Sequence, residues 1–443
     1  MQIYKYIKLS LFIKLLVCLV AVCGVSANGQ DYFRRLGTPN QTSQVLPYEV
    51  TEENTDLAQA RHVLLQQGEE EKYNLALGPL RFSASAGMGA EWTDNVGLSA
   101  VNRQSDFILT PSVNIDTKWR MTEINTLHFS IGMGYSYYTQ HSQYNTNGLI
   151  FSPNSEIAFT IHVGNFAFTV RDQFALLNDA IALIGIPNNQ GNGNFRRFQN
   201  LAGVTTDWVV NPVFDLEVSY DHYNMWVLGS NLAGYNVSDQ NIDSFSLTPR
   251  YKIGPGITLG LNTSASFVQY SGTETDAQTY MIGPFIDANV TKNTRIYFGA
   301  GYQYFGRAGN DSEWTVDNSS SFYVRTAIDN RLSSIFSHRI TFTHTTEAGY
   351  NSAYYELYDL EYTANWRVNN NMVVDFRALY QHFDTPGTGG SIGNRYGAEI
   401  GTRYQLTPSV SMGVSYRYVN NNENIPNSNA YQDSVLFNVF YSF

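Results

Sequence analysis

The sequence predicts a closed, antiparallel, up-and-down β-barrel of about eighteen strands that crosses a membrane. Three observations predict this fold. From residue 79 onward, apolar and polar residues alternate with a period of two. The connections between the alternating stretches are short and long in turn, and charged residues avoid the apolar face.

The first alternating stretch is the clearest. Between Leu80 and Trp92, every second residue is Leu, Phe, Ala, Met or Trp, and the residues between them are Arg, Ser, Gly and Glu. In an extended strand this pattern gives one apolar face.

A barrel of about sixteen strands is the alternative, because residues 320–353 alternate weakly. The same pattern predicts further strands near residues 107–119, 127–137, 149–163, 166–176, 198–210, 213–226, 242–253, 257–270, 279–290, 295–306, 320–328, 338–346, 354–367, 372–383, 395–406, 410–419 and 431–443.

The lengths of the connections predict the topology. Short turns on the periplasmic side and longer loops outside are typical of outer-membrane barrels. Short connections fall at residues 164–165, 211–212, 254–256, 291–294, 369–371 and 407–409. Longer ones fall at residues 94–105, 139–148, 177–197, 227–241, 271–278, 307–319, 384–394 and 420–430.

Proline recurs at one place in four predicted strands. Pro111, Pro153, Pro249 and Pro284 each follow two alternating apolar or aromatic residues after a long loop, which suggests a duplicated hairpin. Because proline cannot donate a hydrogen bond to a ladder, we expect bulges or a locally wide register at these positions.

A soluble sheet would alternate in the same way, so the membrane prediction depends on volume and charge. Eighteen strands enclose an interior that inward apolar side chains could not fill, and the chain offers no second layer. Placing a Lys or Arg side chain on the lipid face at the bilayer midplane costs about 2–4 kcal/mol. The charged residues of the predicted strands alternate with the apolar residues and so lie on the opposite face. Asp172 and Glu356 are exceptions, which we expect near the ends of the spanning part or beside a bulge.

The composition and the N-terminus indicate the compartment. The chain has 31 Tyr, 26 Phe and 35 Gly with 15% charged residues, which favours a β-protein with aromatic belts over a helical enzyme. Lysines followed by the apolar run 15–22 and by Val25-Ser26-Ala27 predict a signal peptide over residues 1–27. A retained anchor and lipidation at Cys23 are minor alternatives.

Removal of residues 1–27 would take away Cys18 and Cys23, so we expect a mature chain without disulfides. It would leave 24 basic and 38 acidic residues, a formal charge of −14, which excludes broad nucleic-acid binding. Residues 28–78 read as a periplasmic N-terminal extension with a short helix near 54–68, and residues 79–443 as the outer-membrane barrel. The helix would pack at the periplasmic mouth or enter the barrel as a plug, and a partly ordered tail is the alternative.

Three motifs carry a resemblance to a family. Trp92-Thr93-Asp94-Asn95-Val96 is followed by Asp106-Phe107-Ile108-Leu109-Thr110-Pro111, and the last strand ends on Phe443 with alternating aromatic and aliphatic residues before it. Together they resemble the bacterial outer-membrane putative β-barrel porin family, some members of which are associated with exopolysaccharide secretion. The resemblance implies a pore in the outer membrane of a Gram-negative-type bacterium. The last strand resembles those of outer-membrane barrels, which implies the barrel-assembly machinery as a partner.

We therefore expect a porin-like channel for passive passage of small polar solutes or saccharides, surrounded by outer-membrane lipid. Charges of both signs are predicted to line it, and mutual neutralisation that stiffens the wall is an equal alternative. The channel-lining candidates are Arg171, Arg250, Arg325, Asp359, Glu361, Asp375, Arg377, Glu399, Arg403 and Arg417.

The loop at residues 177–197 is apolar although it lies in a connection. One hypothesis is that it folds into the barrel as a constriction, and the alternative is that the flanking strands extend above the membrane. The residues concerned are Ile181, Leu183, Ile184, Ile186, Arg196 and Arg197.

No enzyme, metal site or cofactor is predicted. The histidines are scattered and lack metal-ligand spacing, and no glycine loop precedes a helix. The rival functions are a non-conducting adhesion or scaffold barrel that displays its loops, and, as a minor reading, a lipid hydrolase that uses His141 and Ser142. A homo-oligomer is left open.

Overall fold

The structure is a computed structural model. It describes residues 73–145, 148–180, 194–230, 238–271, 276–308, 319–348, 354–384, 392–424 and 429–443. The predicted signal peptide and the predicted helix near residues 54–68 lie outside the described residues.

The described residues form twenty labelled strands and one short 3₁₀ helix. In chain order these are β1 (Leu75–Leu77), β2 (Leu80–Thr93), β3 (Asp106–Arg120), β4 (Thr126–Gly134), β5 (Tyr137–Tyr138), η1 (Ser142–Tyr144), β6 (Ile150–Val163), β7 (Phe166–Ala180), β8 (Asn194–Asn211), β9 (Phe214–Ser230), β10 (Gln240–Gly254), β11 (Ile257–Tyr270), β12 (Asp276–Thr291), β13 (Thr294–Ala308), β14 (Ser319–Asn330), β15 (Phe336–Ala348), β16 (Tyr354–Arg367), β17 (Met372–Asp384), β18 (Ile392–Thr407), β19 (Val410–Glu423) and β20 (Ala430–Ser442).

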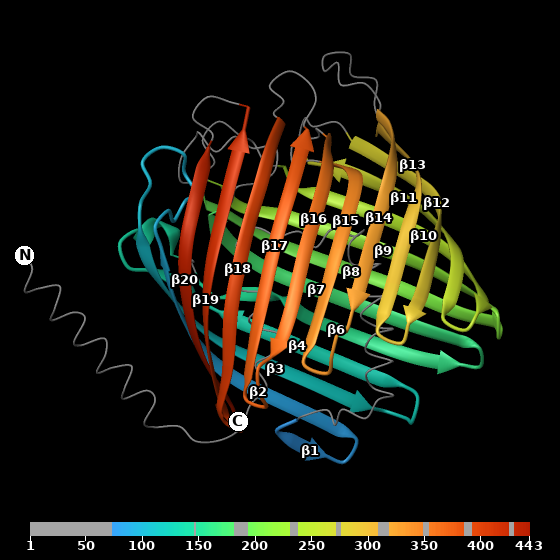
Figure 1. Ribbon diagram of the computed structural model, residues 1–443, viewed down its shortest axis with the longest axis horizontal. Coiled ribbons are helices and arrows are strands. Elements are labelled where there is room, and N and C mark those ends of the chain that lie inside the picture. Colours follow the sequence, from blue (N-terminus) through green and yellow to red (C-terminus); the bar gives the residue numbers. More distant parts are fainter. Residues whose placement is uncertain are drawn as a thin grey trace, which may run out of the picture.

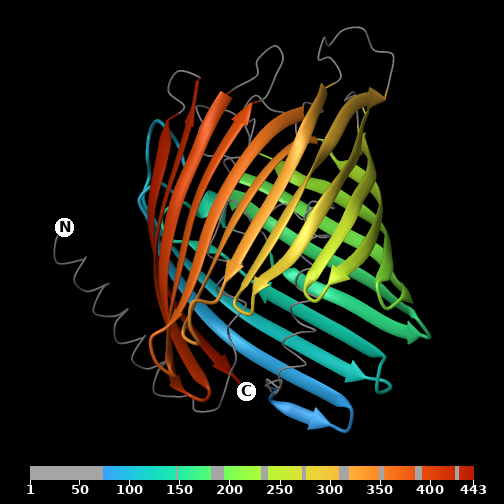
Figure 2. The same cartoon turned by 45° about the vertical axis from the view of Figure 1, so that its right-hand side comes forward.

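The strands close into a barrel (Figures 1 and 2). Neighbouring strands pair antiparallel, and β2 pairs with β20 from Ser85↔Ser442 to Thr93↔Ser434. Because β4 and β5 both pair with β3, they are two parts of one interrupted strand. The nineteen labels from β2 to β20 therefore describe eighteen barrel strands, which confirms the predicted fold. The strand β1 pairs with the start of β2 and was not predicted from the sequence.

We expected a bulge or a locally wide register at each strand proline, and a bulge is present at one position of the four. Between β6 and β7 the register shifts around Pro153. Pro111, Pro249 and Pro284 keep the register with β2, β9 and β11 respectively. Their missing N–H groups interrupt the ladder on one side instead. At Pro111 this interruption separates β4 from β5, although the amide of Tyr135 still donates to the Pro111 carbonyl.

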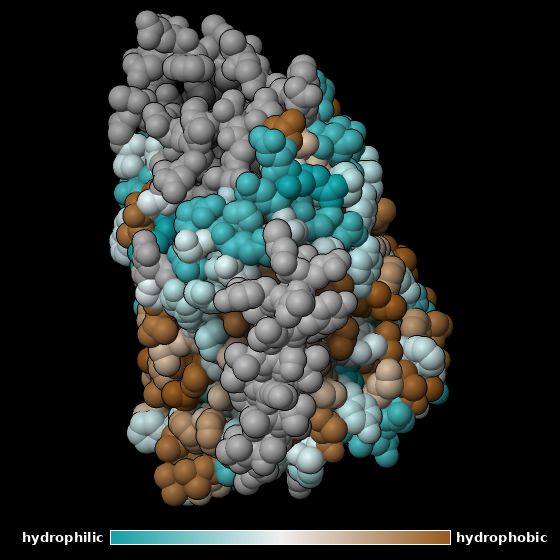
Figure 3. Space-filling model, turned by 90° about the vertical axis from the view of Figure 1, so that its left-hand side faces the viewer, coloured by the Kyte–Doolittle hydropathy of each residue, from teal (hydrophilic) through white to brown (hydrophobic). Residues whose placement is uncertain are grey.

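The apolar row of each strand lies on the outside of the barrel. On β10, Phe245, Leu247 and Tyr251 are exposed, whereas Ser244, on the other parity, is buried. Near the turn at residues 164–165, the rings of Phe166 and Trp208 stack with their centroids 5.4 Å apart. On the flank seen in Figure 3, hydrophobic residues cover the lower part and hydrophilic residues form a zone above it. Among the described residues, no helix has the length and apolar character needed to span a bilayer.

Candidate functional site: the lumen wall

Paired charges line the inner face of β7 to β10. Arg171 donates from Nη2 to Asp221 Oδ1 at 2.6 Å, and both side chains are buried. The two residues lie on β7 and β9, and Gly203 on β8 stands between them in register. A Cβ at Gly203 would lie 1.9 Å from the Asp221 carboxylate. The missing side chain therefore lets this ion pair cross a strand.

Arg250 is the centre of the same group. Its Nη2 lies 2.7 Å from Asp207 Oδ1 and its Nη1 lies 3.1 Å from Glu217 Oε2, while its Nε donates to Asp215. Lys252 lies 3.1 Å from the other oxygen of Asp215. One guanidinium thus contacts three carboxylates, a network that positions all of these side chains against the wall.

A second group of paired charges lies on β16 to β19 and β2. Arg377 makes two contacts with Glu361, at 2.8 and 3.0 Å. Arg403 lies 2.7 Å from Asp375, and Arg417 lies 2.9 Å from Glu91 across β20. The last pair joins the two ends of the barrel across the strand that closes it.

The remaining lining candidates also lie near charged or aromatic partners. Arg325 lies over the ring of Tyr323, with 5.9 Å between its Cζ and the ring centroid. Glu399 is within electrostatic range of Arg377 and Arg417, and Asp359 is within range of Arg377. The structure therefore brings the predicted lining residues together in pairs and small networks.

One lumen histidine was not among the predicted candidates. His128 on β4 lies 2.7 Å from Asp116 on β3 and 2.9 Å from Glu156 on β6, through its two ring nitrogens. Its parity, opposite the apolar residues of β4, was the signal that could have found it. A histidine held between two carboxylates adds a further polar contact to the inner wall.

The constriction hypothesis falls mostly outside the described residues. Ile181, Leu183, Ile184 and Ile186 belong to the undescribed segment, so the hypothesis stays untested there. Arg197 is fully buried, and Arg196 beside it is only half-buried. A register shift between β8 and β9 falls between these two arginines.

An apolar cluster lies on the inner parity of the wall, where the sequence predicted polar residues. Its buried members are Leu201, Tyr223, Met225, Ile242, Val268, Tyr270, Ala277 and Phe305. Phe305 on β13 also packs against Tyr354 on β16, with the ring centroids 5.0 Å apart. The sequence of β8 to β11 could have indicated this apolar cluster, because apolar residues occupy both faces of these strands near their extracellular ends.

The motif residues of the first hairpin hold the extracellular loops. Asn95 donates to the carbonyls of Ser99 and Tyr431, at 2.9 and 2.8 Å, and so ties the first loop to β20. Asp106 accepts hydrogen bonds from the amides of Gln140 and His141 and from the hydroxyl of Thr139, each at 3.0 Å. The motif therefore fixes loop geometry at the rim.

His141 has an acidic partner that the sequence did not identify. Its Nδ1 lies 2.9 Å from Asp106 Oδ2, as in the base and orienting acid of hydrolases. Among the described residues 73–145, however, the structure records no hydrogen bond between the His141 ring and the Ser142 hydroxyl. The Asp106 contacts account for the pair as a loop clamp.

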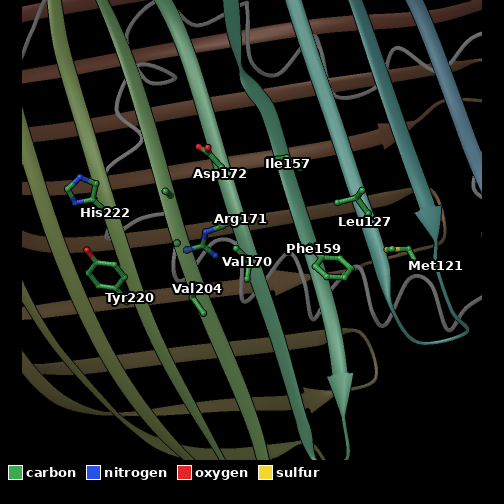
Figure 4. A pocket seen from close by; sticks show the side chains of 12 residues that line it. Met121, Leu127, Ile157, Phe159, Val170, Arg171, Asp172, Val204, Tyr220 and His222 are labelled. Atoms are coloured by element: carbon green, nitrogen blue, oxygen red, sulfur yellow. The ribbon is translucent and has the colours of Figure 1, made fainter.

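Asp172 shares the outer face with apolar residues, as its parity indicated. It accepts a hydrogen bond from Asn200, and it borders a shallow apolar depression that includes Val170, Val204 and His222 (Figure 4). His222 in turn lies 2.7 Å from Asp243 on β10. Polar groups on this outer face are thus bonded to one another, which lowers the cost of placing them there.

Among the described residues, no group of three or more His, Cys, Asp or Glu side chains is placed to hold a metal ion.

The family described as "Putative beta-barrel porin 2" matches residues 327–443. No curated protein matches the chain.

Solved structures that resemble the chain include three proteins of Pseudomonas. The outer membrane protein OpdK of Pseudomonas aeruginosa is 9% identical, with a TM-score of 0.46 over 82% of this chain and 99% of that chain. OccK2 (OpdF) of the same organism, in complex with glucuronate, is 12% identical, with a TM-score of 0.46 over 82% and 98%. A BenF-like porin of Pseudomonas fluorescens Pf-5 is 10% identical, with a TM-score of 0.45 over 82% and 99%.

The family match covers the end of β14 and all strands from β15 to β20. It confirms the resemblance that the sequence motifs predicted. With a closed barrel that is apolar outside and charged inside, the chain is an outer-membrane β-barrel similar to the putative β-barrel porin family over residues 327–443.

Proposed function

We propose that small polar solutes, saccharides among them, pass passively through the lumen of this barrel. The observation that carries the proposal is the separation of the two faces. Charged pairs such as Arg403–Asp375 and Arg377–Glu361 lie inside a closed ring whose outer face is apolar. A wall that presents both signs of charge to water suits neutral polar solutes better than it suits ions of one sign.

The test is conductance of the purified full chain in planar lipid bilayers, combined with swelling of liposomes in sugar solutions. The proposal expects discrete current steps with weak preference for cations or anions, together with swelling in mono- and disaccharides. Folded protein that inserts without either signal would overturn it.

A non-conducting scaffold is the second candidate, and one observation favours it. Several inner side chains in the extracellular half, including Leu201, Met225 and Phe383, are fully buried. A lumen filled at that level would carry loops without carrying solutes. The same bilayer recording separates the two candidates, because a filled barrel gives no current steps.

Three further predictions concern partners and cargo and not the channel itself. Recognition by the barrel-assembly machinery is supported by the terminal strand, whose last residue, Phe443, donates its amide to the Ala84 carbonyl beside the closing seam. Export of exopolysaccharide and self-association have no contact in the described residues that favours them. The expectation that the protein is not an enzyme also stays a prediction.

A further inference from the structure

The ladder between β14 and β15 ends early. Its seven pairs run from Asn330↔His338 to Val324↔His344. The neighbouring ladders continue, with twelve pairs between β13 and β14 and thirteen between β15 and β16. Above Val324 and His344, each strand therefore pairs on one side only, and the wall is split.

The split begins at the depth of hydrocarbon. Six steps of about 3.4 Å along a strand tilted by roughly 40° rise about 16 Å, while the apolar band of such barrels is about 25 Å tall. Phe322, two residues beyond the last pair, faces outward and is 61% exposed. The unpaired ends therefore start within the membrane and not above it.

Side chains replace the missing ladder. Gln303 of β13 donates from Nε2 to the Thr346 carbonyl at 2.5 Å, and its Oε1 accepts from the Thr346 amide at 3.0 Å. The hydroxyls of Ser321 and Thr346 lie 3.0 Å apart. One glutamine thus satisfies backbone groups of β15 that lipid could not satisfy.

Tyr323, the residue of β14 next to the last pair, points away from the split. Its ring lies on the lumen side of β13 and β12, and its hydroxyl donates to the Gly283 carbonyl at 3.4 Å. A Cβ on Gly283 would lie 2.6 Å from that hydroxyl. The split is therefore held by a few side-chain hydrogen bonds, which break more readily than a continuous ladder does.

The chemistry on the two sides of the split differs. Outside, the His344 ring lies between Phe322 and Tyr358, with centroid distances of 4.9 and 4.1 Å. Inside, Arg325 lies below the split, and Tyr355 donates to Glu347 at 2.7 Å. An apolar group could pass the rings while a polar group stays among the charges.

We propose that the split between β14 and β15 is a lateral exit, latched by Gln303, through which small amphipathic molecules leave the lumen for the outer leaflet. This rests on the proposed function in one respect, since such molecules must first enter the lumen. It goes beyond that function because the path ends in lipid and the molecules carry an apolar part.

The test locks the split with a disulfide. The described residues contain no cysteine, so Ser321→Cys with Thr346→Cys introduces the one pair there. Ser244→Cys with Ser266→Cys is the matched control, because those hydroxyls lie 2.9 Å apart across the continuous ladder between β10 and β11. Bond formation is checked by thiol titration.

Two probes are followed in cells that express the full chain in a lipopolysaccharide-containing outer membrane. N-phenyl-1-naphthylamine becomes fluorescent on entering lipid, and nitrocefin reports aqueous passage to a periplasmic β-lactamase. The proposal expects the locked split to lower dye entry to the level of cells without the protein, with nitrocefin entry unchanged and dye entry restored by a reductant. The control disulfide is expected to change neither probe.

A second variant opens the latch. Gln303→Ala removes three hydrogen bonds, two with the Thr346 backbone and one from the Thr345 hydroxyl. Because each such bond shifts an equilibrium by about fivefold, dye entry is expected to rise by at least that factor. Gln381→Ala, a buried inner glutamine beside complete ladders, is the control.

The lateral exit is overturned if neither the disulfide between positions 321 and 346 nor Gln303→Ala changes dye entry. It is also overturned if that disulfide lowers the entry of dye and of nitrocefin equally. Wild-type cells that admit nitrocefin but no extra dye overturn the exit and leave the channel standing. Wild-type cells that admit dye but no nitrocefin overturn the proposed channel and support the exit.

Discussion

At the scale of single residues, burial decides which charges matter most for stability. Arg171 and Asp221 are 8% and 0% exposed, whereas Arg339 and Asp329 are 41% and 37% exposed. A surface ion pair contributes about 0–1 kcal/mol. Removal of one partner from a buried pair leaves an unpaired charge and costs about 3–5 kcal/mol. The Arg171–Asp221 pair is therefore the sharper place to test the wall.

Asp221→Asn is expected to lower the free energy of unfolding by about 3 kcal/mol, because Arg171 loses its charged partner while remaining buried. The double variant Arg171→Met with Asp221→Leu is expected to recover most of the loss. Guanidinium unfolding of the full chain in detergent measures both changes. If the double variant has a lower free energy of unfolding than Asp221→Asn, the Arg171–Asp221 pair stabilises the wall by more than mutual neutralisation of its charges. Asp329→Asn, in the exposed pair, is the control.

The sequence predicted the face of these residues but not their partners. Parity alone placed Arg171 inside, since Val170 and Asp172 take the other face. Its partner lies two strands away and is reached because Gly203 has no side chain. Such a contact depends on the register of three strands, which periodicity does not specify. The sequence also missed His128, whose two carboxylate partners lie on different strands.

At the scale of elements, glycines allow close contacts between β12, β13 and β14. A Cβ on Gly301 would lie 2.1 Å from the carbonyl oxygen of Ile282, a backbone atom that cannot rotate away. Gly301→Ala is therefore expected to destabilise the barrel by roughly 1–3 kcal/mol. Gly229→Ala, with no atom within 4 Å of the added carbon, is expected to be close to neutral. Heat-modified migration of the folded barrel on gels compares the two, and equal midpoints would contradict the steric account.

The clamp around Asp106 predicts the behaviour of a loop. Tyr144 is buried in the short helix η1, and burial raises the pKa of its hydroxyl to about 12. Asp106→Asn weakens the hydrogen bonds that hold residues 139–141, so chymotrypsin is expected to cleave after Tyr144 several times faster while the barrel stays folded. Asp384→Asn, at the extracellular end of β17, serves as a control. The rings of Tyr138 and Tyr144 also contact each other, with their centroids 5.7 Å apart. Cleavage at the wild-type rate would mean that this contact holds the loop without Asp106.

Strand positions could be predicted more readily than strand pairing. The period of two located the strands and their short turns, and those predictions hold from β2 to β20. The weak alternation at residues 320–353 was interpreted as a hairpin that a barrel of about sixteen strands would lose. Both strands are present, and the weakness shows instead as a ladder that ends after seven pairs. The glutamine that completes this ladder lies on β13, outside the weak stretch.

At the scale of the whole molecule, the closure of the sheet into a barrel places the polar residues of every strand around one lumen and the apolar residues outside. The strand β20 pairs with both β19 and β2, so the closing ladder has no free edge. Arg417 reaches Glu91 across β20, and Asn95 and Gln432 join the first loop to the same strand. The first hairpin and the last strand, which carried the family resemblance in the sequence, are thus the parts that meet at the seam.

The central claim is that the outer face of residues 79–443 contacts lipid while the inner face contacts water. Strand β11 tests it best, because neither of its faces carries a charged residue. Single cysteines at Leu259, Leu261, Asn262 and Ser264 can be spin-labelled in the full chain with the predicted leader removed, in reconstituted bilayers. The account predicts that labels at Leu259 and Leu261 relax with oxygen, and that labels at Asn262 and Ser264 relax with a water-soluble nickel chelate. Reversed accessibility, or no alternation along β11, would contradict it.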